Sequence, residues 1–160
     1  MNIFALSHDP REAAQWVVDK HVVKMVLETA QILSAVSWRY GVPAPYRVTH
    51  GSHPCTLWAG ETQANWRWLV DHGFALAEEY RRRYEKTHAS ESIIAWAEKH
   101  GGRPPLQPDV RTDFAQAMPD EYRQKDPVLA YRAYYQGSKI KFASWKPPAV
   151  PPPWWNVQVS

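Results

Sequence analysis

The chain has 160 residues, of which 44% are hydrophobic, and its formal net charge is only +3. This length suits one compact domain, and the apolar content excludes a mainly disordered chain. No apolar run approaches the roughly 18 residues of a membrane span, and the single cysteine, Cys55, excludes an internal disulfide. We therefore expect one soluble, cytoplasmic domain over residues 1–160, without a signal peptide and without membrane contact.

The N-terminal quarter of the chain predicts two helices after a short extended start. Asp9 followed by Pro10 is typical of a helix N-cap and first turn, and this helix is expected to run towards Asp19. A long second helix is expected from Asp19 to Tyr40, because Gly41 is a natural stop. Apolar residues cover most of the circumference of this second helix, so we expect it to be largely buried.

The middle of the chain predicts the longest helix. It is expected to begin at Pro54 and to continue through residue 86, with Gly73 as the one position that can interrupt it. The charged residues over 78–83 are expected to form its solvated end. The following segments are expected to be a helix over 88–99, a loop over 101–113 and a turn or short helix over 114–126.

The C-terminal part predicts one more helix and a tail. Asp126 and Pro127 repeat the cap-plus-proline signal, so a helix is expected through Tyr135 and should end at Gly137. The tail, residues 147–160, is too rich in proline to be helical and is expected to lie extended against the body. The predicted fold class is therefore all-α: a single compact helical domain with an extended Pro/Trp-rich C-terminal tail.

The long second helix carries one polar seam on an otherwise apolar surface. At about 100° per residue, five polar side chains fall on this seam: Lys20, His21, Lys24, Glu28 and Gln31. A glutamate there can act as a general base or stabilise a developing cation, while the imidazole and ammonium tune its charge and hold a phosphate. We predict Glu28, His21 and Lys24 as catalytic residues. The alternative is that they satisfy buried backbone groups or pair with one another.

Two indoles and an amide occur at helical spacing in the segment WAGETQANWRW. We predict that Trp58, Asn65 and Trp68 form a base pocket, in which the amide hydrogen-bonds a base edge and the rings stack on the base. Core packing around a buried asparagine is the alternative.

The segment THGSHPC offers a different kind of site. His50, His53 and Cys55 could contribute to a zinc or iron centre of a metal-dependent hydrolase or nucleotide-modifying enzyme. Their spacing matches no strong metal motif, and His53 before Pro54 is as readily a helix cap, while Cys55 is as readily a small buried hydrophobe. We therefore expect no metal and no other cofactor, and we keep the metal enzyme as an alternative.

The last 34 residues combine cations and aromatic side chains, because no Asp or Glu occurs from Pro127 to Ser160. Aromatic faces stack on bases, and cations bind phosphates with salt-sensitive affinity. We therefore predict DNA as the partner; the alternative is a tail whose aromatic side chains only cover the core. The predicted DNA-binding residues are Lys20, Lys139, Lys141, Trp145 and Lys146.

Four segments of the chain are similar to a family of small uncharacterised phage proteins that also begin with MNIF: DKHVVKMVLETAQ, THGSHPCTLWA, MPDEYR and AYRAYYQGSKIKFASWK. More distantly, the order of parts resembles the phage pyrimidine-dimer DNA glycosylases. The shared parts are a short apolar N-terminus, a helix with His and then Glu seven residues later, a long further helix and a basic aromatic C-terminal segment.

The resemblance to the glycosylases implies an all-α fold and a chemistry. In that family the terminal α-amino group attacks the sugar C1′ and forms a Schiff base, and the helix glutamate supports the sugar cation and later strand cleavage. Carried over, His21 and Glu28 match the helix pair, and Lys24 stands among the phosphate-binding cations. The family's amine belongs to a small residue exposed by removal of the initiator methionine, whereas Asn2 here favours retention of Met1.

Together these features predict a DNA glycosylase-like enzyme that acts on a damaged or modified base in DNA. If the amine of Met1 is out of reach, we expect a glycosylase that uses water activated by Glu28 instead. A helical nucleic-acid-binding protein without enzymatic activity, in which the polar seam is structural, is a further alternative.

Overall fold

The computed structural model describes residues 1–105 and 109–155, which contain helices and no strand. The prediction of an all-α fold is therefore confirmed. The α-helices are α1 (Pro10–Trp16), α2 (Asp19–Arg39), α3 (Pro54–Ala59), α4 (Gln63–Tyr84), α5 (Glu91–His100) and α6 (Pro127–Ser138). Two single-turn 3₁₀ helices, η1 (Asp120–Tyr122) and η2 (Ile140–Phe142), flank α6.

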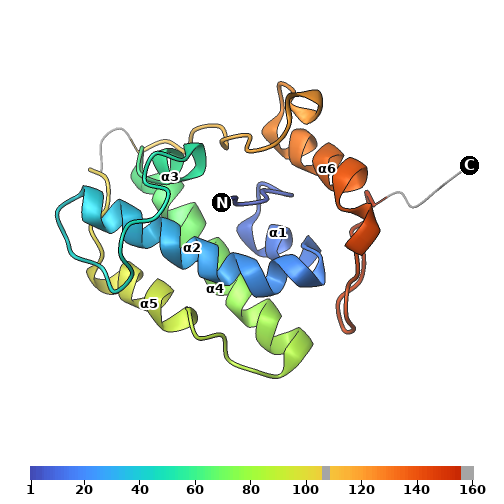
Figure 1. Cartoon of the computed structure of the whole chain (residues 1–160), viewed down its shortest axis with the longest axis horizontal. Coiled ribbons are helices and arrows are strands. Elements are labelled where there is room, and N and C mark those ends of the chain that lie inside the picture. Colours follow the sequence, from blue (N-terminus) through green and yellow to red (C-terminus); the bar gives the residue numbers. More distant parts are fainter. Residues whose placement is uncertain (106–108, 156–160) are drawn as a thin grey trace, which may run out of the picture.

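Helix α2 is the centre of the molecule. It packs against α3, α4 and α5, and α1 packs against α4 (Figure 1). The core forms where α2, α4 and α5 meet, because the apolar side chains of all three helices are fully buried there. Its largest members from these helices are Ile32, Leu33, Trp66, Leu69, Leu76 and Ile94. Burial of each such side chain contributes about 1.5–3 kcal/mol, so this junction fixes the position of α2.

The helix starts follow the predicted caps. Asp9 Oδ1 accepts a hydrogen bond from Arg11 N at 2.9 Å ahead of α1, and Asp126 Oδ1 accepts one from Val128 N at 2.9 Å ahead of α6. Each carboxylate satisfies a backbone N–H that the first turn of a helix leaves without a partner. Helix α6 continues one residue beyond Gly137, to Ser138. Any side chain at position 137 would collide with the ring of Tyr122.

The prediction of one helix from Pro54 to residue 86 is wrong, because the chain breaks between α3 and α4. Helix α3 ends at Gly60, and Thr62 starts α4 by accepting a hydrogen bond from Asn65 N at 3.0 Å. Gly73 does not interrupt α4. Its lack of a side chain instead permits close packing, since a Cβ there would lie 2.8 Å from Cγ2 of Thr29 on α2.

The charged end of α4 is not wholly solvated, which corrects a second prediction. Arg83 and Glu79 are buried, and Arg83 Nε donates to Glu79 Oε1 at 2.8 Å. The same guanidinium binds Asp19 Oδ1 at 3.0 Å and the carbonyl oxygens of Gln15 and Val17. Arg83 thereby supplies donors to the corner between α1 and α2, where the helix end leaves carbonyl oxygens without helical partners.

The segment after η2 returns to the start of α2. Ser144 O accepts a hydrogen bond from Asp19 N at 2.8 Å, and Trp145 Nε1 donates to Trp16 O at 2.9 Å. Trp154 packs edge-on against Trp16. The described part of the predicted tail, residues 147–155, contains no helix; residues 156–160 of that prediction lie outside the described residues.

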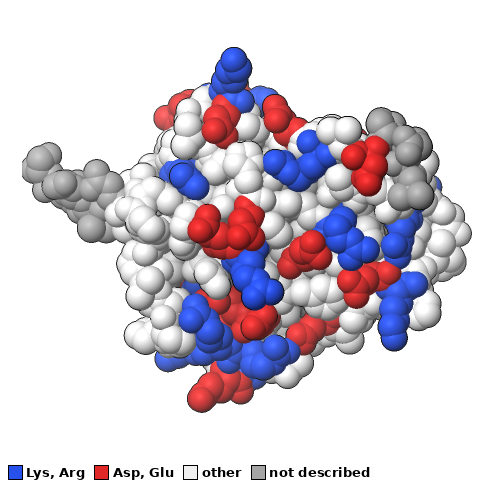
Figure 2. All heavy atoms as spheres, turned by 180° about the vertical axis from the view of Figure 1, so that it is seen from behind, with Lys and Arg blue, Asp and Glu red and all other residues white. Residues whose placement is uncertain are grey.

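Acidic and basic side chains are interspersed on the face opposite to that of Figure 1, so this face carries no large patch of one charge (Figure 2).

In the described ranges, every helix is too short or too polar to cross a membrane. Several large apolar side chains are exposed on α2 and the loop after it, including Val23, Leu27 and Val48.

Candidate active site

A cavity of about 500 Å³ surrounds the first residues of the chain. The N-terminus lies in the middle of the view, between α2, α3 and α6 (Figure 1). The walls come from the N-terminal segment, the first half of α2, the start of α3, the segment before η1 and the end of α6. The lining residues are Met1, Asn2, Phe4, His21, Lys24, Met25, Glu28, His53, Pro54, Gln116, Ala117, Met118, Tyr134 and Lys139.

Glu28 is the buried acid of this cavity, with an exposed fraction of 6%. Its Oε1 accepts a hydrogen bond from Asn2 N at 3.0 Å and lies 3.3 Å from the nitrogen of Met1. Its Oε2 lies 3.9 Å from Nζ of Lys24, one helical turn earlier. A carboxylate held between a backbone N–H and two cationic groups can accept a proton or stabilise a positive charge that develops beside it.

The side chain of Asn2 holds the N-terminal segment in place. Its Oδ1 accepts hydrogen bonds from Ile3 N at 2.7 Å and Phe4 N at 3.0 Å, and its Nδ2 donates to Ala117 O at 2.8 Å. Phe4 has a φ of 43°, which is unfavourable for a residue with a bulky side chain. The three bonds of Asn2 therefore fix an unusual backbone turn that directs the first nitrogen atoms towards Glu28.

His21 forms the inner wall of the cavity beside Phe4. The two rings stack at 4.1 Å, and His21 Nδ1 hydrogen-bonds Oη of Tyr135. Burial, together with the positive charges of Lys139 and Lys24, lowers the pKa of His21 to about 3. The imidazole is therefore neutral at physiological pH, and it positions Phe4 and the cavity wall rather than supplying a cation.

Two lysines add positive charge to the cavity. Lys139 Nζ lies 4.5 Å from the ring centre of Tyr134 and 5.7 Å from that of Phe4, and it donates to Tyr134 Oη at 3.2 Å. Cation–π contacts of this kind hold an ammonium in a defined place. Lys24 is different, because 69% of its side chain is exposed and free to meet a ligand.

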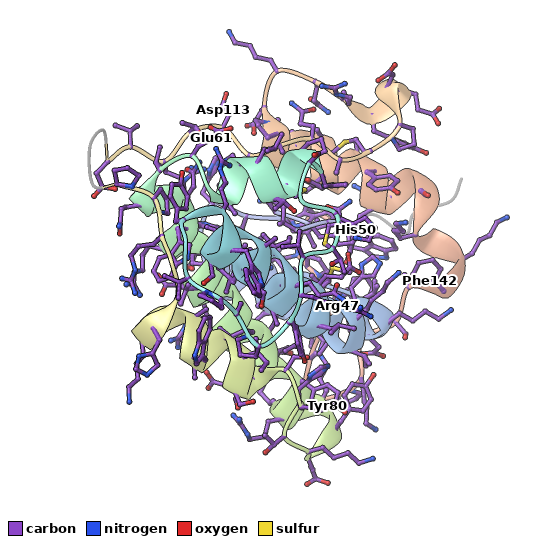
Figure 3. All side chains as sticks on the ribbon, turned by 60° about the vertical axis from the view of Figure 1, so that its left-hand side comes forward. Arg47, His50, Glu61, Tyr80, Asp113 and Phe142 are labelled. Atoms are coloured by element: carbon purple, nitrogen blue, oxygen red, sulfur yellow. The ribbon has the colours of Figure 1, made fainter. Side chains whose placement is uncertain are left out.

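The other predicted DNA-binding residues lie beyond the cavity lining. Lys20 Nζ lies 4.7 Å from the ring centre of Phe142, which Figure 3 labels on the segment after α6. Lys141 and Lys146 are exposed. Trp145 is half-buried, and its ring packs against Trp155 at 5.0 Å. The structure thus places Lys139 in the lining of the same cavity as Glu28 and leaves the remaining cations outside that lining.

The predicted base-pocket residues do not line the Glu28 cavity. Trp58, Asn65 and Trp68 are buried in the core. Asn65 Nδ2 donates to Trp58 O and to Thr112 Oγ1, both at 2.8 Å, and Asn65 Oδ1 accepts from Thr112 N at 2.9 Å. Glu61 and Asp113 mark this region in Figure 3, well separated from Phe142. Because these hydrogen bonds occupy the amide, we leave the three residues out of the proposed site.

The residues of the alternative metal site lie in different surroundings. His50 is exposed on the loop between α2 and α3 (Figure 3), His53 caps α3 and lines the cavity, and Cys55 is buried. Burial raises the pKa of the Cys55 thiol to about 12, which disfavours the thiolate form that metals bind. In the part of the chain that the structure describes, no three His, Cys, Asp or Glu side chains are grouped to hold a metal ion.

Several lining residues carried no signal in the sequence. Phe4, Tyr134 and the segment 116–118 reach the cavity through folding contacts between distant parts of the chain. The sequence pattern around His53 predicts only a helix cap or a metal ligand. The one available signal for the N-terminus was the resemblance to enzymes that use a terminal amine.

Comparison with known proteins shows the family of the chain. The family model described as pyrimidine dimer DNA glycosylase matches residues 1–92, more than half of the chain. No curated protein and no solved structure matches the chain. The matched region contains the N-terminal segment, the seam of α2 and His53, whereas Tyr134 and Lys139 lie beyond it. By this match, the chain belongs to the pyrimidine dimer DNA glycosylase family.

Proposed function

We propose that the protein is a bifunctional DNA glycosylase, which excises a damaged or modified base and then cleaves the strand. DNA is the substrate class that its family implies. One observation carries the finer proposal: Glu28 Oε1 lies 3.0 Å from Asn2 N and 3.3 Å from Met1 N, inside a cavity of about 500 Å³. Attack at a sugar carbon requires a nucleophile and a group that can accept its proton. The amine and the carboxylate, which are in contact here, are such groups.

The first step of the proposed reaction breaks the glycosidic bond. The terminal amine, in its unprotonated form, adds to the sugar C1′, and the bond from C1′ to the base breaks with its electron pair leaving on the base. Glu28 stabilises the positive charge that develops on the sugar and accepts a proton from the attacking nitrogen. The nitrogen lone pair then breaks the bond from C1′ to the ring oxygen, which takes the proton from Glu28, and a Schiff base between the amine and C1′ results.

The second step is strand cleavage. The Schiff base acidifies the protons on C2′, and the carboxylate of Glu28 accepts one of them. The electron pair from that C–H bond forms a new double bond, and the 3′ phosphate leaves with the pair from its own bond to carbon. Lys24 and Lys139 are the ammonium groups that line the cavity and can neutralise phosphate charge beside it.

The same nitrogen position is available whichever residue carries the amine. Met1 N and Asn2 N both lie against Glu28 Oε1, so removal of Met1 would place the amine of Asn2 at the same carboxylate oxygen. The amine is therefore within reach, which favours the amine mechanism over a glycosylase that uses activated water.

Trapping of the Schiff base tests the proposal. The full chain is incubated with UV-irradiated duplex DNA and, in parallel, with DNA that carries modified pyrimidines, each in the presence of sodium borohydride. We expect a covalent protein–DNA adduct, and we expect mass spectrometry to locate it on the N-terminal peptide and to identify residue 1 or 2. Cleavage of the glycosidic bond without an adduct, detected as alkali-labile sites in the DNA, would support the water mechanism. Absence of glycosidic cleavage in all of these substrates would overturn the proposed function.

A further inference from the structure

His53 enters the cavity from a separate element, the start of α3. It lines the cavity together with Glu28 and Met1. A tight turn positions it: His50, with a φ of 51°, accepts a hydrogen bond from His53 N at 3.0 Å. The side chain of His53 then caps α3, because its Nδ1 accepts a hydrogen bond from Cys55 N at 3.1 Å.

This cap determines where the imidazole carries its proton. A nitrogen that accepts a hydrogen bond from a backbone N–H must offer its lone pair, so Nδ1 of His53 is unprotonated. The proton of the neutral ring is therefore on Nε2, the ring nitrogen farther from the backbone. Burial lowers the pKa of His53, and the terminal amine and His50 lower it further, while Glu28 raises it. The neutral ring with an Nε2–H is the form that these surroundings favour.

Four other polar residues of the cavity differ from His53. Glu28 is an acceptor that already contacts the nitrogens of residues 1 and 2, and Nδ1 of His21 is engaged by Tyr135. Lys24 and Lys139 are charged ammonium groups suited to phosphates. His53 instead offers a neutral N–H donor, held in one orientation by the cap.

We propose that His53 is a further catalytic residue, whose Nε2–H donates a hydrogen bond to a carbonyl oxygen of the leaving base. This inference rests on the proposed glycosylase function. When the glycosidic bond breaks, the base takes the electron pair, and the resulting negative charge spreads onto its carbonyl oxygens. A fixed donor lowers the energy of this anion without giving up its own proton, and water protonates the base afterwards. Meanwhile, the amine beside Glu28 forms its bond to the sugar carbon.

Two amide substitutions separate this role from capping. In His53→Asn the amide oxygen can replace Nδ1 as the cap acceptor, but nothing replaces Nε2–H. In His53→Gln the amide nitrogen can reach the position of Nε2, but the cap is lost. His53→Ala removes both functions and serves as the reference.

Single-turnover base release, DNA affinity and thermal melting are measured for each variant on the substrate that the wild type processes. We expect His53→Asn to melt close to the wild type but to release base about 10²-fold more slowly, as loss of one fixed donor does, with unchanged DNA affinity. We expect His53→Gln to melt about 2–4 °C lower, as loss of a cap does in a chain of this size, while it retains more activity than His53→Asn.

The outcomes are distinct from failure of the proposed function. If the wild type releases base, Glu28→Gln does not, and His53→Asn releases base at the wild-type rate, His53 is only a cap and this inference is wrong. If His53→Asn instead weakens DNA binding with an unchanged single-turnover rate, the donor meets a phosphate rather than the leaving base, which also overturns it. A wild type that cleaves no glycosidic bond in any of the substrates refutes the proposed function itself.

Discussion

Glu28 Oε1 and the backbone nitrogen of Asn2 lie 3.0 Å apart although the two residues are separated by 26 positions. Two sets of contacts create this relationship. The core between α2, α4 and α5 fixes Glu28, and the amide of Asn2 fixes the N-terminal segment through Ile3, Phe4 and Ala117. The acid and the amine are therefore pre-positioned in the free protein, and binding of DNA does not have to bring them together.

Glu28→Gln tests whether this carboxylate is catalytic. Glutamine keeps the size of the side chain, and its amide oxygen can still accept the hydrogen bond from Asn2 N. We expect a melting temperature close to that of the wild type and a fall in base release of about 10²–10⁴-fold, the usual contribution of general acid–base catalysis. Thermal melting and a base-release assay on one purified variant provide both readouts. A variant that melts early but keeps its specific activity would assign Glu28 a structural role.

Asn65→Ala tests the base-pocket prediction against core packing. The substitution removes three hydrogen bonds and leaves Thr112 N–H without its acceptor. We expect loss of about 2–3 kcal/mol of stability and no change in base release per folded molecule. Urea unfolding and an activity assay at low temperature measure the two effects. Normal stability combined with lost activity or altered base preference would return Asn65 to the active site.

Thr112→Val is the matched variant for this test. It removes the Oγ1 that accepts from Asn65 Nδ2 but keeps the side-chain volume. If Asn65 acts through this network, the two substitutions should not be additive. The double variant should then lose less stability than the sum of the losses of the two single variants.

Helices with local sequence signals were predicted correctly. Features that depend on contacts between distant parts of the chain were not. Asp9 and Asp126 announce helix starts because their side chains cap nearby backbone groups. The break at Gly60 has a local signal too, a glycine followed by the capping residue Thr62, which the prediction of one helix from Pro54 does not use. The base-pocket prediction therefore places Trp58 and Asn65 on one continuous helix, whereas Trp58 belongs to α3 and Asn65 to α4.

The candidate site was predictable in part for the same reason. The helical period alone places His21, Lys24 and Glu28 on one seam, and all three line the cavity. No period relates this seam to Ala117 or Tyr134, which reach it through the return of the chain. Burial of Arg83 was equally invisible, because it depends on carbonyl oxygens at the end of α1 that need a donor.

Lys139→Ala combined with Lys141→Ala tests the predicted DNA contacts. Each lysine that neutralises a phosphate adds about 0.9 to the slope of log affinity against log salt, so we expect the slope to fall by about two units. Fluorescence anisotropy with duplex DNA at several salt concentrations measures it. Lys86→Ala combined with Lys99→Ala is the control, because it removes the same charge from exposed positions outside α6 and the segment after it. An equal change in the control would indicate a net-charge effect rather than a local DNA site.

Buried histidines predict a specific loss of stability in mild acid. Burial lowers the pKa of His72 to about 4 and that of His21 to about 3. Between these values and the ordinary value near 6.5, the unfolded chain binds protons that the folded chain does not bind, so falling pH favours unfolding. Stability is therefore complete above about pH 6.5 and declines below it, by about 2 kcal/mol per histidine between pH 7 and pH 5.

His72→Asn isolates one of the two contributions. His72 Nδ1 is bonded to Pro10 O at 2.9 Å, and the amide nitrogen of asparagine can take over this donation without a group that titrates. We expect the variant to lose about 2 kcal/mol of the wild-type difference in unfolding free energy between pH 7 and pH 5, measured by urea titration. Most aspartates and glutamates keep their charge at pH 5, so they add little to this difference. A wild type that is equally stable at both pH values, or a variant that keeps the full difference, would show that His72 does not remain neutral in the folded protein.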